Sequence, residues 1–225
     1  MILGIYGAGG LGREVLELAK QIESVEKKWS EILFVADLRE TFNEVKEVNG
    51  KKVIDFEVAM QRFKSDEIQF VVAVGEPAVR RLLFEKIKTR GYFCSTLIHP
   101  DVHIPETTEL AEGVVVQTQA VISCNVKIGE NTFIQNTATV GHDTIIGKHD
   151  VISANTAIAG HCMIGDQVYI ALNVPVKEET RIGDNSIIGM GAVVLRDIPE
   201  NVIAMGNPAR PIKNKNDSKV FKNRE

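Results

Sequence analysis

Residues 140–158 read VGHDTIIGKHDVISANTAI, and an aliphatic side chain returns at every sixth position of this stretch. The same period continues in both directions without an insertion, which gives sixteen consecutive aliphatic positions. They are Ile104, Leu110, Val116, Ile122, Ile128, Ile134, Val140, Ile146, Ile152, Ile158, Ile164, Ile170, Val176, Ile182, Ile188 and Val194. The residue after each is usually small, as at Gly141, Gly147 and Ser153. A fixed period of six residues is typical of a β-helix.

This period also predicts how the coils are built. Each hexad makes one short flat face whose aliphatic side chain points inward, and the small residue after it lets the chain turn a corner. Three faces close one coil, so residues 18 apart should stack, and sixteen hexads make roughly five coils. The repeat therefore supplies its own continuous core.

The composition of the chain excludes several classes of protein. Its 225 residues carry a net charge of −4, so nothing favours a general nucleic-acid binder. No apolar run approaches the roughly 20 residues that span a bilayer, and no signal peptide is seen after Met1. Three widely spaced cysteines argue against a disulfide framework, and we interpret Cys124 and Cys162 as small packing residues. We expect a cytoplasmic protein with no membrane insertion.

The first residues predict a phosphate-binding unit. A strand over residues 2–6 runs into Gly7-Ala8-Gly9-Gly10-Leu11-Gly12, and apolar residues at helical spacing follow. Gly7 allows a tight turn, Gly9 lets the backbone approach a phosphate, and Gly12 packs the helix on the strand. A second strand over residues 32–36 ends at Asp37, where a carboxylate commonly binds the hydroxyls of a ribose. The alternative is that these glycines only shape a turn.

A small parallel sheet follows from the rest of this half. A third strand over residues 68–74 stops at Gly75-Glu76-Pro77, a helix carries the chain to Gly91, and a fourth strand is expected over residues 92–97. The ligand should lie at the carboxyl ends of the strands, beside the glycine loop, Asp37 and Gly75. One half of a Rossmann unit has room for one nucleotide, so we expect a ligand that contains a mononucleotide. A dehydrogenase function would account only for the glycine loop and leaves more than half of the chain unexplained.

Three of the five histidines lie in the repeats. His142 stands one residue past the corner at Gly141, where a side chain can point outward, and Asp143 follows it. His161 is 18 residues beyond Asp143, so the two should stack on one outer face. A histidine beside a carboxylate suits general-base catalysis near neutral pH, although a solvated surface histidine fits the pattern too. We interpret His149 as a surface residue, and we see no three-histidine zinc site of the carbonic anhydrase kind.

We divide the chain into three parts. Residues 1–97 form the Rossmann-like domain, residues 98–199 the β-helix, and residues 200–225 a C-terminal extension. The extension ends in a charged tail with few apolar side chains, which we expect to be solvated. Its basic residues are Lys213, Lys215, Lys219, Lys222 and Arg224.

Several of these motifs together resemble a known family. Residues 1 to about 212 resemble the left-handed β-helix acetyltransferases of the sialic acid O-acetyltransferase group, which includes nucleotide-sugar N-acetyltransferases for bacillosamine and perosamine precursors. The resemblance rests on the hexads and on Tyr6-Gly7-Ala8-Gly9-Gly10, Asp37, Leu97-Ile98-His99-Pro100, Gly141-His142-Asp143 and Gly206-Asn207-Pro208-Ala209. It implies a left-handed β-helix, a homotrimer, and acetyl-CoA as cosubstrate in the groove between neighbouring subunits, with no metal.

The resemblance also implies roles for single residues. His142 matches the general base and Asp143 the acid that orients it. The positions that line the family's coenzyme channel are matched by Gly160, Ala171, Gly189 and Met190. The positions that bind the nucleotide sugar are matched by Gly7, Gly9, Gly10, Asp37, Gly75 and Glu76. Two histidines common in the family are replaced, by Val151 near the thioester and by Leu11 after the glycine loop. A backbone amide would then have to stabilise the oxyanion.

The expected reaction is acetyl transfer to the amino group of a nucleotide-linked sugar in surface polysaccharide biosynthesis. One alternative is O-acetylation of a sialic acid or related glycan, because a hydroxyl needs a base more than an amine does and the catalytic residues alone do not separate the two reactions. Another is a non-catalytic trimeric binder of sugar nucleotides. The His142–Asp143 pair argues against the binder, and the glycine loop favours an acceptor that carries a nucleotide.

Overall fold

The N-terminal half of the computed structural model is a small α/β unit, and the model describes residues 1–37, 47–215 and 219–221. Four parallel strands lie in the order β4-β2-β1-β5, with β3 antiparallel at the β4 edge. Their bounds are β1 Ile2–Tyr6, β2 Glu31–Ala36, β3 Glu47–Val48, β4 Lys51–Asp55 and β5 Ile68–Val72. Three helices accompany them, α1 Gly10–Glu26, α2 Phe56–Arg62 and α3 Pro77–Thr89.

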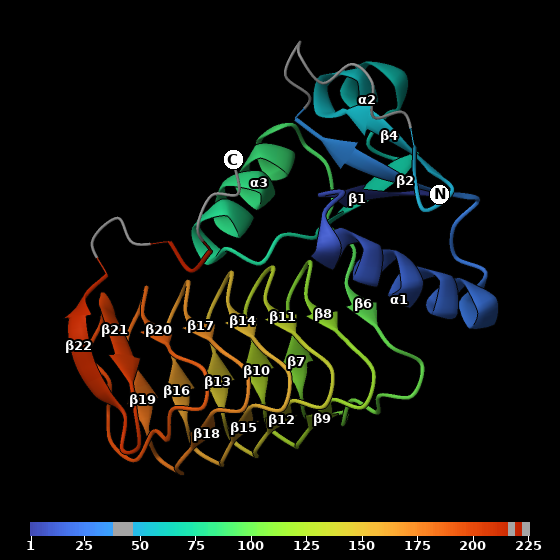
Figure 1. Cartoon of the computed structure of the whole chain (residues 1–225). Coiled ribbons are helices and arrows are strands. Elements are labelled where there is room, and N and C mark those ends of the chain that lie inside the picture. Colours follow the sequence, from blue (N-terminus) through green and yellow to red (C-terminus); the bar gives the residue numbers. More distant parts are fainter. Residues whose placement is uncertain (38–46, 216–218, 222–225) are drawn as a thin grey trace.

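Helix α1 joins this sheet to the rest of the molecule. Its buried side chains, among them Val15 and Leu18, share one hydrophobic cluster with β1 and with residues that point outward from the coils, Val115, Phe133 and Val151. Figure 1 shows α1 lying between the sheet and the first coils. The two halves are therefore held together by a common apolar core.

The predicted half-Rossmann pattern is confirmed, with one error and one omission. Residues 92–96 are not a strand: Cys94 makes a single bridge to Phe70, and the chain then crosses to the coils, where β6 Leu97–Ile98 pairs with β8. Strand β4 and helix α2 were not predicted from the sequence. A signal for α2 was present, because Asp55 caps it by accepting a hydrogen bond from the Glu57 amide.

The C-terminal half is the expected left-handed β-helix, whose two-residue strands stack into three sheets (Figure 1). The first face holds β7 Glu109–Leu110, β10 Lys127–Ile128, β13 Ile145–Ile146, β16 Met163–Ile164 and β19 Arg181–Ile182. The second face holds β6, β8 Val115–Val116, β11 Phe133–Ile134, β14 Val151–Ile152, β17 Tyr169–Ile170 and β20 Ile187–Ile188. The third face holds β9 Val121–Ile122, β12 Thr139–Val140, β15 Ala157–Ile158 and β18 Pro175–Val176.

The stacking register is 18 residues, as the period predicts. Lys127 pairs with Ile145, and Thr139 pairs with Ala157. The aliphatic column forms one buried core, to which Ile104 and Leu110 add partly buried side chains at the first coil. The backbone turns through the left-handed region once per corner, for example at Asn125, Asp143 and His161, with φ of 57° or 58°. Asn, Asp and His accept this conformation more readily than most residues.

The chain ends by returning toward the N-terminal half. Strand β21 Val202–Met205 extends the second face beyond β20, and β22 Arg210–Asn214 folds back antiparallel to it. Residues 219–221 then lie against the start of α3. Of the tail residues, Lys215 is buried rather than solvated, whereas Lys222 and Arg224 lie outside the described residues. The division at residues 97 and 199 stays a prediction.

The described ranges 1–37, 47–215 and 219–221 contain no helix that is both long and apolar enough to span a membrane.

Candidate active site

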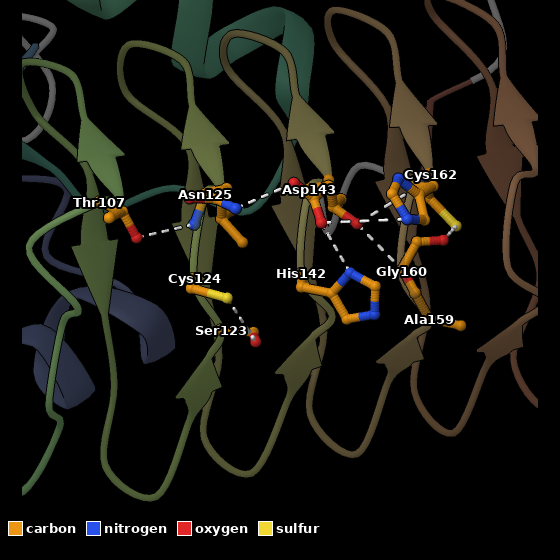
Figure 2. Close-up of polar contacts among 12 residues, drawn as sticks. Thr107, Ser123, Cys124, Asn125, His142, Asp143, Ala159, Gly160 and Cys162 are labelled. Carbon is orange, nitrogen blue, oxygen red and sulfur yellow. Dashed lines mark hydrogen bonds and ion pairs between the residues drawn. The ribbon is translucent and has the colours of Figure 1, made fainter.

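The predicted catalytic pair stands at the corner where the third face turns into the first. Gly141, His142 and Asp143 connect β12 to β13, and the imidazole and the carboxylate are both exposed. His142 Nδ1 lies 2.8 Å from Asp143 Oδ2, as Figure 2 shows. The corner therefore presents both side chains outward, away from the aliphatic core.

Asp143 is held in place by the coils on either side of it. Asn125, one coil earlier, donates a hydrogen bond to Asp143 Oδ1 at 3.0 Å, and His161 Nε2, one coil later, lies 3.9 Å from Oδ2. The hydrogen bonds from His142 and Asn125 hold the pKa of the Asp143 carboxyl below its usual range. An ionised carboxylate can only accept, so His142 Nδ1–H must donate to it, and Nε2 is left as an acceptor.

The His142 ring packs against Gly160. This glycine lies 18 residues after His142, and a Cβ added there would come within 2.8 Å of the His142 Cε1 atom. Figure 2 shows the ring beside Gly160 on the outside of the coils. The absence of a side chain at this glycine therefore sets where the imidazole can lie.

The environment of the cysteines partly differs from the expectation. Cys162 is buried, as expected of a packing residue, but Cys124 is exposed. Cys124 lies 18 residues before His142 and so occupies the matching outward position one coil earlier, beside the imidazole in Figure 2. An outward corner position, not the small size of cysteine, decides its exposure.

His142, Asp143 and His161 are also a group that could bind a cation. One ligand atom from each lies within 4.8 Å of the others, and the two imidazole rings meet edge to face at 5.0 Å. All three side chains are exposed. The geometry of this group fits a proton acceptor with an orienting carboxylate equally well.

His149 is buried, so the interpretation of it as a surface residue is wrong. Its ring packs edge-on against Phe84 of α3, and the Asn131 side-chain amide lies 3.0 Å from its Nδ1. Burial, together with the positive charge of Arg80, lowers the pKa of His149 to about 4. Helix α3 covers this corner, which the local hexad pattern cannot reveal.

The glycine loop has the geometry that its sequence predicts. Gly7 has φ of 122°, and a Cβ at Gly12 would overlap the Gly7 carbonyl oxygen. Above Gly9 and Gly10, by contrast, no atom lies within 4 Å of an added Cβ, and the described residues provide no side-chain cap for α1. Open backbone at a helix N-terminus suits a phosphate group.

Asp37 lies at the end of β2, where it was expected. Tyr6 Oη donates to Asp37 Oδ1 at 2.7 Å, and Lys86 Nζ of α3 lies 2.5 Å from the same oxygen. Burial and the neighbouring carboxylate raise the pKa of Tyr6 above its usual range. The Asp37 carboxylate is thus positioned by Tyr6 and Lys86, and the sequence predicted such a role for neither side chain.

A cavity of about 400 Å³ opens between the glycine loop and the second face of the coils. Gly75 lies on its wall as predicted, but the Glu76 carboxylate is engaged elsewhere, because its Oε2 accepts hydrogen bonds from the Val220 and Phe221 amides. The other residues on the wall are Gly9, Gly10, Leu11, Glu14, Ala73, Val74, Gln135, Val151, Tyr169 and Phe221.

The residues predicted for the coenzyme lie on two different edges of the prism. Ala171, Gly189 and Met190 line a cavity of about 360 Å³ at the corner between the second and third faces. Gly160 lies at the other corner of the third face, beside His142. A single chain therefore does not bring the four into one groove.

Two aromatic residues at these cavities were missed by the sequence analysis. Tyr169 and Phe221 line both cavities, and their rings meet edge to face at 5.7 Å. Tyr169 could have been found, since it precedes the aliphatic Ile170 and so points outward on the second face, 18 residues after Val151. Phe221 belongs to no repeat, and nothing in the local sequence signals its return to α3.

Three features define the class of protein: the stacked hexads, the outward histidine–carboxylate pair, and the N-terminal unit with room for one nucleotide. The chain is a left-handed β-helix acetyltransferase. Comparisons with known proteins narrow this class. Residues 3–87 match the model of the PglD N-terminal domain family. A comparison with curated protein sequences finds no match.

Solved structures match almost the whole chain. The acetyltransferase domain of PglB from Neisseria gonorrhoeae, also solved with acetyl coenzyme A, is 29% identical with a TM-score of 0.86, over 94% of this chain and 99% of that one. PerB from Caulobacter crescentus, in complex with CoA and GDP-perosamine, is 26% identical with a TM-score of 0.84, over 95% and 98%. WeeI from Acinetobacter baumannii is 28% identical with a TM-score of 0.83, over 94% and 100%. The chain is thus similar over nearly its whole length to acetyltransferases, among them PglB and PerB.

Proposed function

We propose that the protein transfers an acetyl group from acetyl-CoA to the amino group of a nucleotide-linked amino sugar, for use in building a surface glycan. The observation that carries this proposal is the His142 imidazole, whose Nδ1 is fixed by Asp143 while its Nε2 is left as an outward acceptor. The similarity to PerB, a protein solved with CoA and GDP-perosamine, supports the class of acceptor.

The chemistry follows from the tautomer of His142. Acetyl-CoA supplies the acyl group as a thioester. His142 Nε2 takes a proton from the acceptor amine as the new carbon–nitrogen bond forms, and the same proton can then pass to the departing sulfur as the carbon–sulfur bond breaks. Asp143 stabilises the imidazolium that forms between these steps, as a carboxylate does in a catalytic triad.

The acceptor is bound by the N-terminal half in this proposal. The diphosphate lies over the open backbone of Gly9 and Gly10 at the start of α1, where the helix dipole favours an anion. Gly7 holds the turn, and Asp37 binds ribose hydroxyls at the end of β2. Gly75 bounds the cavity into which the sugar then extends.

A second copy of the chain completes the site, in a homotrimer. We call the cavity in front of the glycine loop the acceptor cavity. This cavity and the one at Ala171 lie on the side where the second face meets the third, whereas His142 and Gly160 lie where the third face meets the first. Apolar side chains are left exposed around the His142 edge, namely Val121, Ile145 and Met163. A cyclic trimer that covers them would bring one edge of a subunit against the other edge of its neighbour, with acetyl-CoA between them.

Replacing His142 tests the proposal directly. General-base assistance is typically worth ~10²–10⁴-fold, so His142→Ala should lower kcat by about that range. The affinity for acetyl-CoA, measured by calorimetry, should stay near the wild-type value because the ring does not form the coenzyme cavity. Turnover is followed by thiol release, and mass spectrometry of the product after mild alkali separates a stable amide from a labile ester.

Two further variants isolate the proton acceptor. Asp143→Asn keeps the size of the side chain but removes the charge that favours the acceptor tautomer, so kcat should fall by a factor that approaches that of His142→Ala. His161→Gln should have a small effect, because His161 contacts Asp143 only at 3.9 Å. Unchanged turnover in His142→Ala, or a larger loss in His161→Gln, would contradict the assignment of the base.

A further inference from the structure

The last described segment of the chain, residues 219–221, returns to the acceptor cavity. Glu76 Oε2 at the N-terminus of α3 accepts the Val220 amide at 2.8 Å and the Phe221 amide at 3.3 Å. The Phe221 ring packs on the backbone of Gly75, where an added Cβ would lie 3.0 Å from the Phe221 Cε2 atom. A carboxylate that could have faced a ligand is thus used to fix this segment.

Phe221 forms a wall of the cavity together with Tyr169. The two rings meet edge to face at 5.7 Å, and both line the space in front of the glycine loop. Phe221 remains 50% exposed, so half of its surface is available to a ligand after packing on Gly75 and Tyr169. The segment is anchored at its backbone and open at its side chain, which is the arrangement of a binding residue.

The order of the strands indicates which part of the acceptor lies at this wall. Strand β1 is the central strand, with β2 and Asp37 on one side and β5 and Gly75 on the other. A nucleoside held at Asp37 with its diphosphate over Gly9 and Gly10 must therefore direct its sugar toward Gly75, Tyr169 and Phe221. An aromatic face beside a sugar can cover its C–H groups, whereas the base and the diphosphate lie elsewhere.

We propose that Phe221, held by Glu76, is a binding residue for the hexose of the acceptor and so contributes to specificity for the sugar. This inference rests on the proposed function, since it takes a nucleotide sugar as the ligand. Phe221 also lines the cavity of the predicted coenzyme residues, such as Ala171. We assign its ring to the sugar because it shares the other cavity with Gly75 and with the open backbone that suits a sugar diphosphate.

The test compares the binding of a nucleotide sugar with that of its nucleotide alone. GDP-perosamine against GDP, and a UDP-linked 4-amino-4,6-dideoxyhexose against UDP, are titrated into wild-type protein by calorimetry. Phe221→Ala should weaken binding of the nucleotide sugar by about tenfold, the effect of one lost aromatic contact, and should leave the binding of GDP or UDP unchanged. In turnover, the KM for the nucleotide sugar should rise while the KM for acetyl-CoA does not.

Two variants complete the experiment. Glu76→Ala removes the acceptor of both amides and should reproduce the loss that is specific to the hexose. Phe93→Ala is the matched control, because Phe93 is a similarly exposed phenylalanine, at 45%, that does not line the cavity. It should bind every probe as wild type does.

The outcomes separate this inference from the proposed function. An equal loss for nucleotide and nucleotide sugar, a loss confined to acetyl-CoA, or no change in Phe221→Ala would each overturn the role of Phe221, while the enzyme still acetylates an amino sugar. A wild-type protein that binds no nucleotide sugar and forms no acetylated product in the mass spectrometer would overturn both.

Discussion

Asp143 and His149 occupy equivalent corner positions, six residues apart, and both have a backbone φ near 60°. Their environments nevertheless differ completely. Asp143 is exposed and bonded to His142, whereas His149 is covered by Phe84 and contacts Asn131. The repeat sets the backbone conformation of each corner, and the packing of α3 decides what the side chain can do. Only a corner that no other element covers can serve as a catalytic site.

The buried state of His149 predicts a dependence of stability on pH. Its pKa is about 4 in the folded protein, against an ordinary value of 6.5. Below pH 6.5 the unfolded chain therefore binds more protons, so stability falls as pH drops from 6.5 toward 4 and the contribution is complete above 6.5. At 1.36 kcal/mol per pKa unit, the loss attributable to this histidine is at most about 3 kcal/mol.

Urea unfolding of wild type and His149→Asn at several pH values between 4 and 7 checks this prediction. Asparagine keeps an acceptor for the Asn131 amide and tolerates the positive φ, but it does not titrate. The variant should lose less stability on acidification than wild type does. His103→Asn, at an exposed histidine, should follow the wild-type curve. Parallel curves for wild type and His149→Asn would contradict the assignment.

At the scale of elements, hydrogen bonds from a buried arginine anchor α3 to the coils. The Arg80 guanidinium donates to the carbonyl oxygens of Val72, Val74 and Asn131 and to the side-chain oxygen of Asn131. Asn131 in turn donates to the Arg80 carbonyl oxygen. Complete burial lowers the pKa of Arg80 to about 9. The same helix carries Phe84 and begins directly after Glu76, so its position affects both the burial of His149 and the placement of Phe221 at the cavity in front of the glycine loop.

Removing this arginine should loosen α3 from the coils. Arg80→Met keeps a long apolar side chain but leaves three carbonyl oxygens without their donor, and breaking a buried charged network of this kind costs about 3–5 kcal/mol. Thermal unfolding of Arg81→Met provides the matched control, because Arg81 is exposed and its ion pair with Glu85 is long, at 3.7 Å. A similar, small change in Tm for both variants would show that Arg80 does not hold the helix.

The elements also show what could be predicted from the sequence. The coils were predictable because each aliphatic side chain, such as Ile146, has its partners 18 residues away in a fixed register. The glycine loop was predictable because its backbone conformation requires Gly7 and Gly12. The crossing of residues 92–96 and the contacts of Arg80 and Phe221 were not predictable, since each joins segments whose separation follows no period.

At the scale of the whole molecule, one chain carries the two parts of the proposed site on separate edges of the β-helix. The His142 corner lies where the third face meets the first, whereas the cavity in front of the glycine loop lies against the second face. The third face between them presents short side chains such as Ala157 outward. No inserted loop interrupts the hexads from Ile104 to Val194 to bridge this distance. A neighbouring subunit can supply the missing half without any such loop.

Mixed assemblies of two inactive variants distinguish a shared site from one within a single chain. His142→Ala lacks the base but keeps the cavity. Gly10→Asp keeps the base and has room for the new side chain, and an acid at the start of α1 suits the helix dipole while it repels the diphosphate. If each site takes its base and its cavity from different subunits, random mixing in equal amounts restores both in about a quarter of the sites.

The two variants, with different affinity tags, are coexpressed and purified through both tags, and native mass spectrometry verifies that the assemblies are mixed. Selection through both tags removes the unmixed trimers, so acetyl transfer should reach about a third of the wild-type rate, well above that of either variant alone, because one site in each mixed trimer joins the intact base of one chain to the intact cavity of its neighbour. The control mixes wild type with the double variant His142→Ala/Gly10→Asp. Its activity should not exceed the fraction of sites in which both neighbouring chains are wild type. Verified mixed assemblies that are no more active than their parents would place the whole site within one chain.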